Sequence, residues 1–126
     1  MIPVLSVYEN IVLPVELDGR KIDKDFLDDV LDILSLKEKI FNLPNTLSGG
    51  QQQRVAIARA IISKPAVILA DEPTGNLDSK TSGDVIKLLR TVNQRFEQTL
   101  IMITHNLEIA QLSDRIINII DGKVDI

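Results

Sequence analysis

The 126-residue chain has no cysteine, no tryptophan and one histidine, His105, and only 3% of its residues are aromatic. The lack of cysteine excludes a disulfide scaffold, a thiolate zinc site and a cysteine nucleophile. A single histidine excludes a metal site built from several histidines. No apolar run approaches the roughly 20 residues of a membrane-spanning helix. The N-terminal residues also lack the basic region and apolar core of a secretory signal, so we expect a cytoplasmic protein.

Positive charge is also scarce. Fourteen Lys and Arg residues stand against eighteen Asp and Glu, which gives a net charge of −4 and a pI of about 4.9. Proteins that bind nucleic acid through bulk electrostatics carry the opposite excess, so we predict no nucleic-acid partner. Nucleotide binding remains open, because a phosphate site is a local feature. The hydrophobic content of 44% is ordinary for a globular protein, and the length fits one domain at most.

The spacing of apolar residues predicts several amphipathic helices. Asp23 has the side chain of an N-cap, and the apolar residues after it repeat at helical spacing. Ser48 and Gln51 form a capping-box pattern, which predicts a helix from there to about Ser63. Further helices are expected over residues 79–95 and 107–111, and a short helix or irregular segment over residues 1–22.

Apolar runs between these helices predict strands. Residues 66–70 and 99–104 are typical of strands buried on both faces of a parallel sheet, and residues 115–120 predict a third buried strand. Asp121-Gly122 favours a type I′ hairpin turn that leads into residues 123–126. The alternation of strands and helices is typical of an α/β fold with a parallel sheet.

Two carboxylates, Asp71 and Glu72, follow the first predicted strand. Ligands of parallel sheets bind beyond the carboxyl ends of the strands. One carboxylate there could hold Mg²⁺ while the other orients an attacking water. An Asp-Glu-Pro turn without any chemical role has the same local pattern, so this feature alone does not decide between the two interpretations.

A serine, two glycines and a glutamine begin the helix at residue 48. Glycines at a helix start let an anion approach the backbone N–H groups closely, and the helix dipole favours phosphate there. The alternative is a plain capping box preceded by a loop.

In combination, the motifs of this chain resemble those of the ATP-binding subunits of ABC transporters. Four stand in the family's order: the signature motif Leu47-Ser-Gly-Gly-Gln51, the Walker B strand Ile68-Leu-Ala-Asp71-Glu72, the D-loop Asn76-Leu77-Asp78, and the switch histidine in Thr104-His105. More narrowly, Ser6-Val-Tyr-Glu-Asn10-Ile and Glu72-Pro-Thr-Gly-Asn-Leu-Asp78-Ser are similar to the lipoprotein-releasing, macrolide-exporting and peptide-exporting branch.

The resemblance implies ATP and Mg²⁺ as cofactors and a role for each site residue. Asp71 would assist Mg²⁺, Glu72 would polarise the attacking water, and His105 would contact the γ-phosphate. Asp78 would belong to the loop that communicates across a nucleotide-sandwich dimer. The signature residues would meet ATP bound to the opposite subunit; these are Ser48, Gly49, Gly50 and Gln51.

The resemblance also implies partners and a division of the chain. A second ATP-binding subunit would complete a head-to-tail dimer, and a membrane permease would contact residues from about 5 to 47. The protein would then lie at the inner face of the cell membrane and power export. Residues 1–47 would be part of a helical, signalling subdomain, and residues 48–126 the C-terminal part of the core of a P-loop NTPase.

None of the six glycines lies in a G-x-x-x-x-G-K-[ST] phosphate loop. In the family this loop precedes the motifs seen here, so we expect the chain to be the C-terminal part of a domain and to be inactive on its own. An unpaired apolar strand edge favours association, so we also expect a dimer, a swapped dimer or a higher oligomer.

The alternative to a fragment of an active ATPase is a non-enzymatic remnant or an interaction module. An ATPase of the DNA-repair type is disfavoured by the short loops and the acidic pI.

Overall fold

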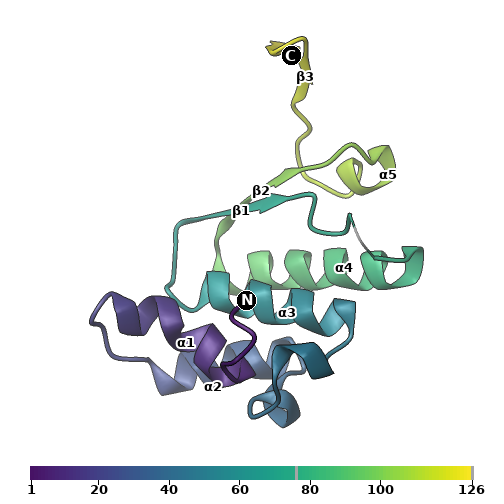
Figure 1. The fold of residues 1–126 in the computed structure, drawn as a ribbon. Coiled ribbons are helices and arrows are strands. Elements are labelled where there is room, and N and C mark those ends of the chain that lie inside the picture. Colours follow the sequence, from purple (N-terminus) through teal and green to yellow (C-terminus); the bar gives the residue numbers. More distant parts are fainter. Residues whose placement is uncertain (76, 126) are drawn as a thin grey trace.

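The helices and the sheet occupy two sides of the molecule, with α3 and α4 against one face of a short parallel sheet (Figure 1). The computed structural model describes residues 1–75 and 77–125. The helices are α1 (Val7–Leu17), α2 (Lys24–Ile33), α3 (Gly49–Ile61), α4 (Ser79–Phe96) and α5 (Leu107–Ala110), with 3-10 turns at Lys37–Lys39 and Pro44–Thr46. The strands are β1 (Val67–Asp71), β2 (Thr99–Ile103), β3 (Asn118–Ile120) and β4 (Lys123–Asp125). The α/β fold expected from the sequence is confirmed.

The predicted helix starts are confirmed by their capping hydrogen bonds. The Phe26 N–H donates to Asp23 at 3.1 Å. Ser48 Oγ accepts from the Gln51 N–H at 3.2 Å, and Gln51 Oε1 accepts from the Ser48 N–H at 2.9 Å, so the capping box is complete. A second capping box, at Ser6, opens α1. The helical interpretation of the N-terminal segment is therefore correct.

The two long strands pair in parallel, with Val67 opposite Thr99 and Asp71 opposite Ile103. Ile68 is 8% exposed, whereas its neighbour Leu69 is 76% exposed. The outer face carries Leu69 together with Val67, Ile101 and Ile103, all of them exposed. Burial of both strands on both faces is therefore a wrong prediction for the described residues, because α3 and α4 cover only one face.

The C-terminal hairpin is confirmed, but its first strand is not buried. Asp121 and Gly122 have φ angles of 50° and 75°, the positive values that a type I′ turn requires. The third buried strand expected over 115–120 is wrong: β3 begins at Asn118, is exposed, and pairs only with β4 among the described residues. The hairpin extends away from the helices, so none of them packs against it (Figure 1).

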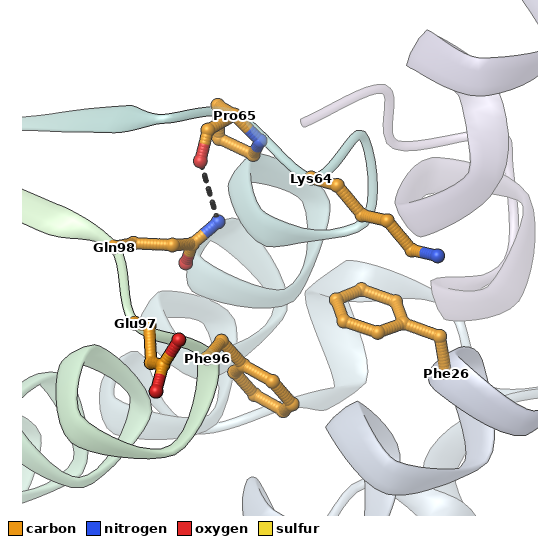
Figure 2. Close-up of a pocket in the computed structure, with 6 residues that line it drawn as sticks. All are labelled: Phe26, Lys64, Pro65, Phe96, Glu97 and Gln98. Atoms are coloured by element: carbon orange, nitrogen blue, oxygen red, sulfur yellow. Dashed lines mark hydrogen bonds between the residues drawn. The ribbon is translucent and has the colours of Figure 1, made fainter.

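An aromatic junction joins α2 to the C-terminal end of α4 (Figure 2). The Phe26 and Phe96 rings lie 5.1 Å apart, with an angle of 59° between their planes. The Lys64 ammonium lies 4.9 Å from the centre of the Phe26 ring, a cation–π contact. These side chains line a hollow of about 300 Å³ together with Gln98, whose Nε2 donates to the Pro65 carbonyl at 2.9 Å. The junction ties residues far apart in the chain into one packed unit.

Among the described residues, no helix has both the length and the apolar character needed to cross a lipid bilayer.

A buried asparagine, Asn10, fixes the segment before α1. Its side chain is fully buried, and its Oδ1 accepts from the Ile2 N–H at 2.8 Å. Its Nδ2 lies 3.0–3.1 Å from the carbonyl oxygens of Ile2, Leu5 and Ser6. A single side chain therefore ties residues 2–6 to the first turns of α1.

We expect Asn10→Ala to lower the free energy of unfolding by about 1–3 kcal/mol, because the Ile2 N–H and the Leu5 carbonyl lose their hydrogen bonds to Asn10. Urea denaturation at one fixed protein concentration measures the change. Asn45→Ala, at an exposed position, is the matched control and should stay within about 0.5 kcal/mol of the wild type. Equal effects of the two substitutions would contradict a structural role for Asn10.

Candidate functional site

The carboxyl end of β1 holds the two adjacent carboxylates. Asp71 is the last residue of the strand and is exposed. The Glu72 N–H donates to the Ile103 carbonyl at 2.8 Å, which continues the pairing of β1 with β2 by one step. Glu72 itself adopts a φ of 45°, a left-handed conformation that residues other than glycine rarely take. Its carbonyl accepts from the Gly75 N–H at 3.1 Å, so a tight turn follows directly.

His105 lies beside Glu72 at the same edge of the sheet. The His105 backbone N–H donates to Glu72 Oε1 at 3.1 Å, and the imidazole Nε2 lies 3.5 Å from the same oxygen. The imidazole is 96% exposed, whereas the Glu72 side chain is 39% exposed. The carboxylate is thus fixed in place by the loop after β2, and the ring is open to a ligand in solvent.

A metal ion at the end of β1 would find one protein ligand there, the Asp71 carboxylate. Residues 1–75 and 77–125 hold no group of three or more His, Cys, Asp and Glu side chains that could bind a metal. Mg²⁺ commonly takes one or two protein carboxylates and completes its shell with water and phosphate oxygens. One oxygen donor at the strand end fits that mode of binding, and it does not fit a site made of protein ligands alone.

The N-terminus of α3 carries the predicted signature residues. Ser48 and Gly49 are exposed, Gln51 is half-buried, and Gly50 is buried. The Ser48 and Gln51 side chains are used by the capping box, so the helix start is rigid. The Gln51 N–H is bonded to Ser48 Oγ. The N–H groups of the two residues before it have no carbonyl a turn earlier to bond to, which leaves them for an anion. The capping box and an anion site are therefore compatible here.

Asp78 begins α4. Its side chain accepts from the Thr81 N–H at 2.7 Å and caps the helix. This backbone hydrogen bond, followed by one from the Thr81 side chain, lowers the pKa of the Asp78 carboxyl below its usual value. Leu77 before it donates its N–H to the Thr74 carbonyl at 3.2 Å. Asn76, the first residue of the predicted D-loop, lies outside the described residues.

All of these residues lie at one end of the molecule. The carboxyl ends of β1 and β2 and the N-termini of α3 and α4 point to the same side, at the right in Figure 1. The hollow at the aromatic junction lies at the other end of α4 and contains none of the predicted site residues. The structure thus gathers the predicted residues into two neighbouring groups, one around Glu72 and one around the start of α3.

Sequence reasoning missed two features of this end. The left-handed conformation of Glu72 has no signal in the sequence, because glycine or asparagine normally marks such a position. The close packing of Gly50 against α4 was also missed: the pair of glycines indicated a ligand approach and gave no sign of a helix contact.

Comparison with known proteins places these residues in a family context. The family model described as ABC transporter matches residues 1–75. The lipoprotein-releasing system ATP-binding protein LolD 1 of Chlorobium chlorochromatii is 42% identical in an alignment 127 residues long, gaps included. The alignment covers 98% of this chain and 52% of the relative. LolD of Rickettsia typhi is 46% identical over 124 residues, which cover 96% of this chain and 56% of the relative.

Solved structures give the same result. The dimeric structure of MJ0796, a bacterial ABC transporter cassette, is similar with a TM-score of 0.76 and 40% identity. The same cassette in a post-hydrolysis state, bound to ADP and Pi, gives a TM-score of 0.77 and 39% identity. Each match covers 99% of this chain and 56% of that chain. The chain spans about half the length of the relatives described here.

The lowered pKa of Asp78 predicts an acid-dependent contribution to stability. A carboxyl with a lowered pKa in the folded state stabilises the fold above its unfolded value of 3.8, and this contribution is lost as the pH falls below that value. Asp78→Asn retains a capping side chain but does not titrate. We therefore expect the wild type to lose more of its thermal midpoint between pH 6 and 3 than this variant does.

Circular dichroism melts at the two pH values measure the difference. Asp84→Asn, a change of equal charge at an exposed position of the same helix, shows how much of the effect comes from net charge alone. Parallel losses in the wild type and in Asp78→Asn would contradict the assignment.

Proposed function

Since this chain belongs to the ABC transporter family, whose ATP-binding subunits it matches, we propose that it supplies the hydrolytic half of an ATP-driven transport cassette. The observation that carries the proposal is the position of Glu72: at the end of β1, beside His105, and on the side where α3 begins. In this arrangement a carboxylate base and an exposed imidazole lie together at the carboxyl end of the sheet. A base that orients water beside a group that contacts phosphate is what phosphate-bond hydrolysis needs.

Glu72 is the residue that we propose polarises the attacking water. The two contacts from His105 involve only Oε1, so Oε2 is the oxygen that we assign to the water. The backbone bond to Ile103 sets the position of the main chain, and the turn to Gly75 sets its direction. The backbone of Glu72 is therefore already in place for its carboxylate to polarise the water.

His105 and Asp71 have complementary roles in this proposal. The His105 imidazole, almost fully exposed, contacts the γ-phosphate and donates a hydrogen bond to it. Asp71 would help to hold Mg²⁺ through its carboxylate, directly or through water, and the bound ion would supply positive charge beside the phosphates. This set of oxygen and nitrogen groups matches ATP and Mg²⁺ as cofactors.

The start of α3 and Asp78 act toward a second subunit. The N–H groups and dipole of the first turn of α3 favour phosphate, and Ser48 at this turn is exposed. We assign Ser48, Gly49, Gly50 and Gln51 to the ATP of a partner subunit in a head-to-tail dimer, and Asp78 to the loop between the subunits. The dimeric form of the related cassette MJ0796 supports this assembly.

Export is the direction that the similarity to LolD supports, since those relatives are named for lipoprotein release. Residues from about 5 to 47, within the partial helical subdomain of residues 1–47, contact the membrane permease and bring the cassette to the inner face of the membrane. Residues 48–126 form the part of the core that carries the chemistry. The aromatic junction between α2 and α4 couples the two regions.

We expect the full-length protein to hydrolyse ATP, and Glu72→Gln to lower kcat by about 10²- to 10⁴-fold while ATP still binds, because only the base is lost. The exposed Glu38→Gln is the matched control and keeps wild-type turnover. A phosphate-release assay and a nucleotide-binding assay separate the two effects.

The 126-residue chain alone should show no turnover, because it has no G-x-x-x-x-G-K-[ST] segment. Turnover by this chain that Glu72→Gln abolishes would show that its phosphate site lies elsewhere. A full-length protein that neither binds nor hydrolyses ATP would favour the non-enzymatic alternative.

The exposed outer face of the sheet predicts self-association of the isolated chain. Leu69 and Ile103 are 76% and 55% exposed on a two-stranded sheet whose edges are unpaired among the described residues. We expect light scattering to show a dimer or a larger species, and Leu69→Lys to shift it toward the monomer. Leu17→Lys, at an equally exposed position on α1, should have no such effect. A monodisperse wild-type monomer would contradict this prediction.

A further inference from the structure

The N-termini of α3 and α4 lie in direct contact. The two helices run side by side in the same direction, so both begin at the end of the molecule that holds the candidate site (Figure 1). A Cβ atom added to Gly50 would lie 2.7 Å from Thr81 Cγ2, closer than side chains pack. One added to Gly49 would lie 3.1 Å from Leu77 Cδ2, at the end of a more flexible side chain. Gly50 therefore faces Thr81 of α4, and its burial has a specific cause.

Thr81 is tied to Asp78 as well as to Gly50. Its side chain is β-branched, so few rotamers are open to it within a helix. The Thr81 backbone N–H donates to the Asp78 carboxylate at 2.7 Å. The Thr81 methyl group is the atom that a Cβ on Gly50 would meet first. Asp78, Thr81 and Gly50 thus form a continuous chain of contacts from the loop after β1 to the first turn of α3.

Of the glycines at residues 50 and 83, only Gly50 lies where a side chain would meet the neighbouring helix. Gly83 lies two residues after Thr81 in α4, and a Cβ atom added there meets nothing within 4 Å. Gly50 has an ordinary helical backbone, since its φ is not among the positive values found in the chain. The absence of a side chain at residue 50 is therefore explained by the distance between the two helices.

We propose that Thr81 is a positioning residue for the start of α3: its methyl group packs on Gly50 and sets where the ATP-facing first turn of α3 lies relative to Asp78. The inference rests on the proposed function, because the placement of this turn matters for activity only if the turn meets ATP. Its consequence is that the signature residues and the loop at Asp78 move as one unit. Thr81 itself touches no nucleotide.

Moving one methyl group from residue 81 to residue 50 tests the proposal. In the full-length protein, Gly50→Ala should lower the thermal midpoint by several degrees and raise the KM for ATP several-fold, because the new methyl group overlaps Thr81. Thr81→Ser removes the opposing methyl group and keeps the hydroxyl group and the backbone N–H that donates to Asp78. The double variant conserves the volume of the contact, so the midpoint should return close to wild type. The KM is compared between the single variants of Thr81, because Gly50 is itself assigned to ATP.

Gly83→Ala is the matched control, with the same substitution in the same region and no contact to lose. Its KM should equal that of the wild type, and its midpoint should not fall, since alanine favours a helix more than glycine does. Should Gly50→Ala fail to fold, the single variants of Thr81 decide. Thr81→Val keeps a methyl group and the wild-type KM, whereas Thr81→Ser raises the KM several-fold with kcat within about twofold.

Different outcomes of these measurements would overturn the contact, the positioning role and the proposed function. A double variant whose midpoint is no higher than that of Gly50→Ala would overturn the contact. Equal KM values for Thr81→Ser and Thr81→Val would show a packing contact only, and would overturn the positioning role. A wild-type protein without ATP turnover would defeat the proposed function, while recovery of the midpoint in the double variant would still support the Thr81–Gly50 contact.

Discussion

The parallel pairing of β1 with β2 is the interaction on which the candidate site depends. Its register puts Asp71 opposite Ile103, so the residues that follow each strand emerge at one edge. The bond from the Glu72 N–H to the Ile103 carbonyl extends the pairing past the end of β1. His105 then reaches the Glu72 carboxylate with its own backbone N–H. A shift of one residue in this register would separate the two side chains, because successive residues of a strand point to opposite faces.

The second constraint is the common start of α3 and α4. Each helix opens with a side-chain cap, Ser48 on α3 and Asp78 on α4, and the caps lie close because Gly49 and Gly50 let the helices approach. Two helix N-termini at one end of a fold produce a region of positive potential. The carboxylates at the end of β1 lie on the same side (Figure 1). In the proposed head-to-tail dimer these two features serve different ATP molecules.

Much of the fold and part of the site follow from local sequence patterns. The capping box at Ser48, the N-cap at Asp23 and the turn at Asp121-Gly122 are all observed, and the helix and strand bounds differ from prediction by a few residues. These features depend on residues within about four positions of one another, so the chain specifies them without its tertiary partners. Glu72 follows the predicted strand 66–70 and His105 follows the predicted strand 99–104, and the carboxyl ends of parallel strands lie at one edge, so their common edge also follows from the order of the elements.

Other features depend on contacts between distant residues. Apolar runs predicted strands buried on both faces, but whether a face is covered depends on which element packs against it, and here only α3 and α4 do. The glycines at residues 49 and 50 indicated a phosphate, while the helix that one of them packs against starts about 30 residues later. Sequence by itself determined the elements, their caps and the candidate residues. The tertiary structure decided which faces are buried and which residues meet, because packing distances between elements are not encoded in any local pattern.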